Sequence, residues 1–250
     1  MSAVNEGRKN GIRRLLKGIE TGDPTGIEVI NPELYIQHNP QTQTSREGLA
    51  ALFERLSKTS PRVNLVRVFS DGDFVFAHTE YDFSTRRIGF EVFRFEGDSA
   101  VEHWDNIQPR RGPNPSGRSM VDGPTEATDL ELTEANRALV GEFIQQVLIG
   151  RDFARFGEWV DGGLVQHDPE LTDGLDAWRT AFEATTRYER NHRILAEGSF
   201  VLAVNEGYLG DVHTAFCDLF RVESGRLAER WNTVEAVPPP ETWKNDNGKF

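Results

Sequence analysis

Several features that define common protein classes are missing from this chain. Its single cysteine, Cys217, excludes an internal disulfide and any cysteine-based zinc cluster. No apolar run approaches the roughly 20 residues that span a bilayer, and residues 1–11 are polar and lack the apolar core of a signal peptide. Phosphate-binding loops, dinucleotide fingerprints and a Gly-X-Ser-X-Gly elbow are also absent. We therefore expect a cytoplasmic protein with no membrane partner.

Positive charge is scarce as well. The 250 residues include 28 Lys and Arg against 40 Asp and Glu, which gives a formal net charge of −12. A nucleic-acid-binding surface needs basic side chains that release counterions from phosphates, so this balance disfavours nucleic acid as a partner. Hydrophobic residues make up 37% and charged residues 27%, proportions typical of a globular protein with an ordinary core.

The chain contains an internal repeat. Residues 35–40 are Tyr-Ile-Gln-His-Asn-Pro, and residues 164–169 are Leu-Val-Gln-His-Asp-Pro. Three further pairs of segments follow in the same order at offsets between 126 and 129: 74–77 with 200–203, 92–96 with 218–223, and 101–105 with 228–232. A steady offset at four ordered sites predicts two tandem copies of one domain.

Both copies predict the same order of elements. Apolar residues recur at helical spacing over 12–19 and 139–147, and a second helix begins near Ser45 in the first copy and after a capping Asp173 in the second. Alternating segments then predict strands at 63–70, 74–83, 88–96 and 100–107, and at 192–197, 200–208, 213–223 and 226–235. The predicted fold class is α+β, with helices packed on one face of an antiparallel sheet.

Composition sets the expected boundaries between these copies. We expect a first domain at 1–110, a linker rich in Pro, Gly, Arg and Ser at 111–130, a second domain at 131–238 and a polar tail at 239–250.

Strand alternation places polar side chains on an apolar face. Glu91 shares a face with Phe93 and Phe95, and His103 shares a face with Asp105. Inward-facing acids and histidines cost several kcal/mol of desolvation unless they are paired, so they typically border a cavity. Such groups have coupled and displaced pKa values, which suits general acid–base catalysis.

The Tyr-Ile-Gln-His-Asn-Pro stretch, the Glu-His-Trp-Asp segment at 102–105 and the order of helices and strands resemble the SnoaL-like polyketide cyclase family. This family belongs to the nuclear transport factor 2-like superfamily of cone-shaped α+β domains, so the resemblance implies two tandem cones, each enclosing a pocket. It also implies cofactor-free aldol-type cyclisation, isomerisation, hydration or hydrolysis of a small apolar or carbonyl-containing molecule. Pairing through the sheets would give a pseudo-dimer within one chain, or a homodimer.

The resemblance places the acid/base at Asp105, at the end of the final strand of the first copy. His103 and His38 would orient this base or polarise a substrate oxygen, and Glu91 would tune their pKa values. The expected substrate-binding residues are His78, Glu80, Phe76, Phe93, Phe95 and Tyr35. The second copy has Arg230 and Asn232 in place of His103 and Asp105, so proton transfer is expected in the first copy alone.

Three alternatives stay open at this stage. His38 has a counterpart in His167, which a purely structural turn residue would also explain. No cofactor is expected, but His38, His78 and His103 could hold a metal ion if the fold brought them together. Finally, both copies could bind a small ligand or support assembly without catalysing a reaction.

Overall fold

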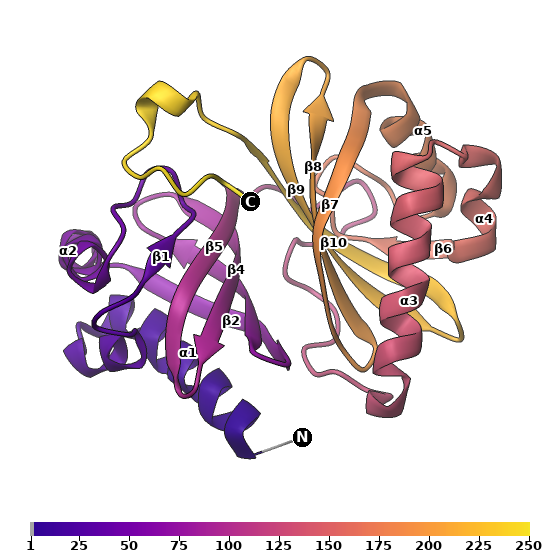
Figure 1. Cartoon of the computed structure of the whole chain (residues 1–250). Coiled ribbons are helices and arrows are strands. Elements are labelled where there is room, and N and C mark those ends of the chain that lie inside the picture. Colours follow the sequence, from indigo (N-terminus) through magenta and orange to yellow (C-terminus); the bar gives the residue numbers. More distant parts are fainter. Residues whose placement is uncertain (1–2) are drawn as a thin grey trace. The chain divides into compact units, whose positions relative to one another are not determined.

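The computed structural model describes residues 3–250, which divide into two compact units. Unit 1 runs to Pro109 and also contains Pro238–Phe250, and unit 2 is Arg110–Val237. Each unit has one five-stranded sheet with helices packed on one face (Figure 1). The tandem duplication and the α+β fold class predicted from the sequence are thereby confirmed.

Unit 1 begins with the helix α1 (Ala3–Thr21) and the short 3-10 helix η1 (Pro24–Val29). The strand β1 (Ile36–Gln37) and the helix α2 (Arg46–Ser57) follow. An antiparallel meander completes the unit with β2 (Arg62–Asp71), β3 (Phe74–Asp82), β4 (Arg86–Glu96) and β5 (Ser99–Pro109).

Unit 2 repeats this order with small additions. The helical elements are η2 (Leu130–Leu132), α3 (Thr133–Phe143), η3 (Ile144–Ile149), η4 (Phe153–Arg155), α4 (Phe156–Trp159) and α5 (Leu175–Thr185). The strands are β6 (Val160–Gln166), β7 (Thr186–Glu197), β8 (Phe200–Leu209), β9 (Val212–Glu223) and β10 (Arg226–Ala236). The last element of the chain, η5 (Pro240–Thr242), lies in the segment that belongs to unit 1.

Each sheet has an edge strand that the sequence did not predict. The sheet orders are β1-β5-β4-β3-β2 and β6-β10-β9-β8-β7, and the edge strands β1 and β6 run parallel to their neighbours. Both edge strands come from the repeated Gln-His motif, with Gln37 beside His103 and Gln166 beside Arg230. The motif therefore delivers polar side chains directly to the end of the final strand.

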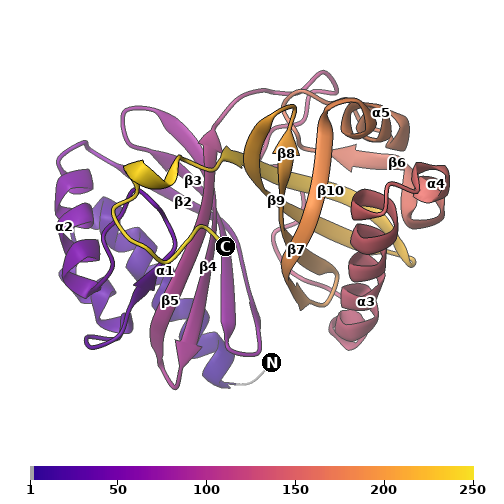
Figure 2. The same ribbon diagram turned by 45° about the horizontal axis from the view of Figure 1, so that its top comes forward.

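The segments that follow the two sheets differ from the expected linker and tail. Residues 110–129 pack within unit 2, and residues 238–250 pack within unit 1. Figures 1 and 2 show the latter segment in yellow, running past β1 to end near β5. Asp173 does not cap α5, because its carboxylate accepts a hydrogen bond from the backbone N–H of Gln166 and the position before α5 is Gly174.

The core of each unit lies between its helices and the inner face of its sheet. In unit 1 the cluster includes α1 side chains such as Leu15 and sheet residues such as Val75 and Phe93. The unit 2 cluster is richer in large rings, including Phe143, Phe156, Trp178 and Phe220. Within residues 3–250, none of the helices is both long and apolar enough to cross a membrane.

Candidate active site

Glu91, His103 and Asp105 come together on the inner face of the unit 1 sheet. In the register of β4 and β5, Glu91 is paired with Asp105, and Phe93 is paired with His103. All three polar side chains are buried, and each offers an atom within 4.8 Å of the others. The shared face predicted by strand alternation is therefore present in the structure.

The partners of His103 restrict where its protons lie. Its Nδ1 is 2.9 Å from Oε1 of Gln37, an oxygen that also accepts from the backbone N–H of Asn39. Nδ1 therefore carries a proton. Its Nε2 is 2.8 Å from Oε2 of Glu91, so the two groups share one further proton across this hydrogen bond.

Asp105 is held from two sides. Its Oδ2 accepts a hydrogen bond of 2.5 Å from Nδ2 of Asn39, which belongs to the Gln-His-Asn-Pro turn. The ammonium of Lys249, near the end of the chain, lies 3.3 Å from Oδ1 and donates a 2.8 Å hydrogen bond to the backbone oxygen of Asp105. Each carboxylate oxygen keeps a second lone pair for another partner.

Two tyrosines lie beside these acids, and among residues 3–250 only the hydroxyl of Tyr81 has a hydrogen-bond partner. The hydroxyl of Tyr81 donates a 2.8 Å hydrogen bond to Oε1 of Glu91. The hydroxyl of Tyr35 is buried, and no residue among 3–250 hydrogen-bonds to it. Burial raises the pKa of Tyr35 well above its ordinary value, and the charges of Glu91 and Asp105 raise it further. Tyr35 is therefore a protonated donor without an acceptor, next to two carboxylates.

In unit 2 a tyrosine hydroxyl also donates to the inward-facing acid, but this tyrosine lies on a different strand from that of Tyr81 in unit 1. Its inward acid is Asp218, which accepts a 2.7 Å hydrogen bond from the hydroxyl of Tyr188 on β7. In unit 1 the cross-strand pair is Val63 with Tyr81, and in unit 2 it is Tyr188 with Gly207. The tyrosine of the pair lies on β3 in unit 1 but on β7, the counterpart of β2, in unit 2. This exchange explains why the two tyrosines do not align in sequence.

The rest of the unit 2 cluster preserves the contacts of unit 1 but not its chemistry. Arg230 donates to Asp218 through Nε and Nη2 at 2.9 and 2.7 Å, in the place of the His103–Glu91 contact. Asn232 donates a 2.8 Å hydrogen bond to Asp168, so donor and acceptor are reversed relative to Asn39 and Asp105. An arginine stays charged in proteins, and an amide is no base at neutral pH. Arg230 and Asn232 therefore cannot take the acid–base roles expected of His103 and Asp105.

An aromatic ring also covers the unit 2 cluster. Ser45 and Gly174 have matching positive φ angles of 88° and 102° and immediately precede α2 and α5. Leu49 lies four residues after Ser45, and Trp178 lies four residues after Gly174, so the two side chains occupy equivalent positions of α2 and α5. The guanidinium of Arg230 lies 4.5 Å from the centre of the Trp178 ring, a cation–π contact that fills the space over the acids.

His38 lies on the opposite face of the sheet from His103. Its ring stacks on Trp104 with centroids 4.6 Å apart, and strand alternation directs Trp104 away from its neighbours His103 and Asp105. The Nδ1 of His38 is 2.9 Å from the backbone oxygen of Gly248, and its Nε2 is 2.9 Å from Oε1 of Glu102. These contacts fasten the turn and the chain terminus together and do not reach Asp105.

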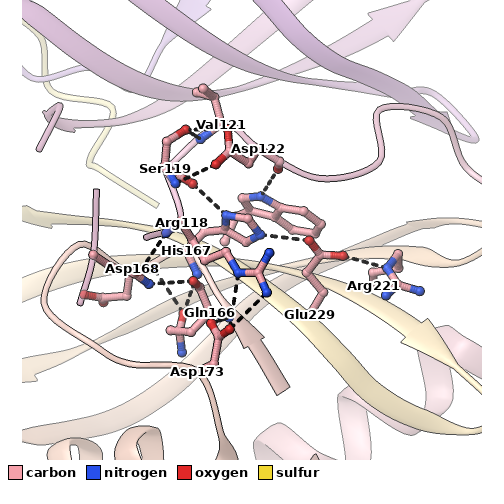
Figure 3. Close-up of polar contacts among 12 residues, drawn as sticks. Arg118, Ser119, Val121, Asp122, Gln166, His167, Asp168, Asp173, Arg221 and Glu229 are labelled. Carbon is pink, nitrogen blue, oxygen red and sulfur yellow. Dashed lines mark hydrogen bonds and ion pairs between the residues drawn. The ribbon is translucent and has the colours of Figure 1, made fainter. Parts of the chain in front are cut away.

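His167 makes the same contacts in unit 2, as Figure 3 shows. Its Nδ1 is 2.6 Å from the backbone oxygen of Ser119, and its Nε2 is 2.8 Å from Oε1 of Glu229. The other carboxylate oxygen of Glu229, Oε2, accepts a hydrogen bond from Arg221. The ring stacks on Trp231, whose Nε1 donates to the backbone oxygen of Asp122. The recurrence of this histidine thus has a structural explanation in both units.

The remaining expected residues divide between the two faces. Phe93 and Phe95 belong to the inner core with Tyr35, as expected for a site wall. Phe76, His78 and Glu80 alternate with inner-face residues of β3 and therefore point to the outer face. His78 contacts Arg67 and the ring of Phe90 there.

A metal site made of His38, His78 and His103 does not form, because the first two lie on the face opposite the third. Glu91, His103 and Asp105 are close enough to hold a cation. However, Glu91 already accepts from Tyr81 and contacts His103, and the ammonium of Lys249 stands beside Asp105. A lysine ammonium next to the cluster opposes binding of a metal cation there.

A separate pocket of about 260 Å³ opens among the helices of unit 1. Its walls come from α1, η1, the turn between them and α2: Gly18, Gly22, Asp23, Pro24, Ile27, Ala50, Phe53, Glu54 and Ser57. Glu91, His103 and Asp105 are not among these lining residues. Those three side chains are themselves buried.

No protein-family model and no curated protein matches this sequence. Solved structures do match it. A candidate ketosteroid isomerase from Kribbella flavida is 21% identical, with 44% of this chain and 84% of that one covered and a TM-score of 0.38. A candidate polyketide cyclase from Streptomyces antibioticus is 17% identical (40% and 91% covered, TM-score 0.36). A nuclear transport factor 2-like protein of unknown function from Cytophaga hutchinsonii is 18% identical (45% and 95% covered, TM-score 0.36). Matches at this level concern the fold, so the chemistry has to be argued from side chains.

Proposed function

We propose that unit 1 is a cofactor-free acid–base enzyme that removes a proton next to the carbonyl group of a small, mainly apolar molecule. The observation that carries this proposal is the Tyr35 hydroxyl, buried and unpartnered among residues 3–250 beside two carboxylates. A buried donor without an acceptor costs about 1–3 kcal/mol, so a site that keeps one is prepared for a ligand oxygen. In unit 2, Leu164 replaces Tyr35, so packing alone does not require a hydroxyl there.

The charges of the cluster favour an uncharged substrate. Glu91 is paired with His103, and Asp105 is paired with Lys249. These pairs leave no net charge to attract an ion into a buried site, where an extra charge would be costly. The nearby rings of Tyr35 and Phe93, which pack on His103, supply apolar surface for the body of the molecule.

The proposed reaction needs only this chain's own groups. The Asp105 carboxylate takes a proton from the carbon next to the carbonyl, and the C–H electron pair forms the carbon–carbon double bond of an enolate. The carbonyl electron pair moves to oxygen, where Tyr35 donates a hydrogen bond to the developing charge. Return of the proton to another carbon isomerises the molecule, and attack of the enolate carbon on a second carbonyl closes a ring. The proton shared by His103 and Glu91 is available to an oxygen that leaves later.

Deuterium exchange tests this proposal without knowledge of the natural substrate. The full chain is incubated in D2O with cyclohexanone, acetophenone and β-tetralone, and loss of the α-proton signals is followed by NMR. We expect catalysed exchange that falls at least about 100-fold in Asp105→Asn. It should be retained in Asp168→Asn, which removes the carboxylate of the corresponding Asn–Asp hydrogen bond in unit 2. Exchange that Asp105→Asn leaves intact would show that the base is elsewhere. If none of the ketones exchanges but they raise the Tm of the protein, unit 1 binds small ligands without catalysis.

A further inference from the structure

The end of the chain is fastened along the turn that carries Asn39. The side-chain amides of Asn245 and Asn247 donate to backbone oxygens of this region at 2.8–3.0 Å: those of Gln37, Asn39 and Thr42. The backbone oxygen of Gly248 then meets Nδ1 of His38. This set of contacts fixes the position of the residue that follows, Lys249.

Lys249 is only 5% exposed, although lysine is almost never buried without a partner. Its ammonium donates to the backbone oxygen of Asp105 and lies 3.3 Å from Oδ1 of the same residue. Removing either member of a buried ion pair leaves an uncompensated charge, which is strongly unfavourable. The chain terminus therefore supplies the positive charge that balances Asp105.

Unit 2 provides an internal comparison. Its segment 110–129 makes the same fastening contacts, with Asn114 donating to the backbone oxygen of Gln166 and the backbone oxygen of Ser119 meeting His167. The position of Asp105 is taken there by Asn232, an uncharged residue that donates to Asp168. In both units, a distant segment thus holds the turn in place by hydrogen bonds. The pairing of a lysine with the acid of the final strand, Lys249 with Asp105, occurs in unit 1.

We propose that Lys249 is a positioning residue of the unit 1 site, delivered by the C-terminal segment to orient the Asp105 carboxylate. Asn39 holds Oδ2 and Lys249 holds the side of Oδ1, so rotation of the carboxylate is blocked on both sides. A base that is fixed in this way reacts without first being reoriented. The inference rests on the proposed function for its consequence in catalysis, but the pairing itself is testable independently.

The pairing is tested by NMR of the full chain labelled with 15N in its lysine side chains. A buried, hydrogen-bonded ammonium exchanges slowly with water, so Lys249 and the equally buried Lys9, which is paired with Glu6, should both give signals. We expect Lys249→Met to remove one of them, the Lys249 signal. Asp105→Asn should shift this signal, whereas Asp168→Asn should leave it in place. A missing signal, or one that Asp105→Asn does not move, overturns the proposal whether or not any reaction is found.

The positioning role is tested with the ketone that exchanges fastest. Lys249→Met should lower kcat about tenfold or more with a nearly unchanged KM, and Lys249→Arg should restore part of the loss. The exposed Lys244→Met is the control in the same segment and should match wild type. Amide hydrogen exchange of residues 244–250 shows whether the segment stays bound. An unchanged kcat in Lys249→Met, or equal losses in both Lys249 variants with release of the segment, overturns the role. If wild type exchanges no ketone, the proposed function fails while the NMR result still decides the pairing.

Discussion

The Nε2 atom of His103 lies 2.8 Å from Oε2 of Glu91, and the contact between Nδ1 and Gln37 leaves these two groups one proton to share. Unit 2 has lost this shared proton, because the permanently charged Arg230 replaces the histidine opposite Asp218. The two units therefore offer matched variants: the same fold holds a histidine–carboxylate pair in unit 1 and an arginine–carboxylate pair in unit 2.

The two buried tyrosine hydroxyls should respond differently to removal. Tyr188→Phe deletes a hydrogen bond to the buried Asp218 and should lower the free energy of unfolding by about 1–3 kcal/mol. Tyr35→Phe deletes a hydroxyl that has no partner among residues 3–250, so stability should be unchanged or slightly higher. Urea unfolding of both variants measures the difference. A Tyr35→Phe variant as destabilised as Tyr188→Phe would mean that the Tyr35 hydroxyl has a structural partner.

Asp105 and Lys249 should be energetically coupled. Each single change, Asp105→Asn or Lys249→Met, leaves a buried charge without its partner and should cost about 3–5 kcal/mol of stability. The double variant buries neither charge and should be more stable than the sum of the two losses predicts, by at least about 1 kcal/mol. Chemical unfolding of all four proteins completes the cycle. Additive losses would show that the two groups do not interact.

Glu102 should contribute to the loss of stability in acid. Burial raises the pKa of Glu102, but hydrogen bonds from Arg94 and His38 lower it more, so its pKa lies below the ordinary glutamate value. A depressed pKa in the folded state stabilises the protein above the unfolded value of about 4.3, and this contribution is lost as pH falls through the folded value.

Urea unfolding between pH 7 and pH 3 tests this sign. Glu102→Gln should lose less stability than wild type over that interval, because it has no carboxylate to protonate. The exposed Glu28→Gln is the control and should follow wild type. If Glu102→Gln and wild type fall in parallel, the carboxylate of Glu102 is not the group that senses acid.

Restoring the proton-transfer residues to unit 2 should not create a second active site. A chain with Arg230→His and Asn232→Asp still has Trp178 over the cluster and Leu164 in place of the Tyr35 hydroxyl. With Asp105→Asn in the same chain to silence unit 1, we expect no catalysed deuterium exchange. Near-ultraviolet circular dichroism confirms that the variant is folded. Measurable exchange would contradict the importance given to the Tyr35 hydroxyl.

Local patterns predicted much of this fold. Alternation on β4 and β5 placed Glu91, His103 and Asp105 on one face, because neighbouring antiparallel strands kept the expected register there. The repeated motifs likewise indicated two copies with the same order of elements. These are short-range properties of the chain, or comparisons of the chain with itself.

The remaining features depend on contacts between distant residues. Lys249 lies 144 positions from Asp105, and no sequence pattern near either residue predicts that they pair. The face of β3 that points inward was ambiguous, since Ala77 and His78 both lie in an apolar context, and the packing of α1 decides it. Tyr81 and Tyr188 reach equivalent acids from different strands, which sequence alignment of the copies conceals.

The most direct measurement compares deuterium exchange into a ketone for three proteins side by side: wild type, Tyr35→Phe and Tyr188→Phe. If Tyr35 stabilises the developing negative charge on a bound carbonyl oxygen, its loss should lower the rate about 100- to 1000-fold. Tyr188→Phe should exchange at the wild-type rate, although it is the less stable protein. Equal rates in wild type and Tyr35→Phe would contradict the account, because the unpartnered hydroxyl would then have no part in the chemistry.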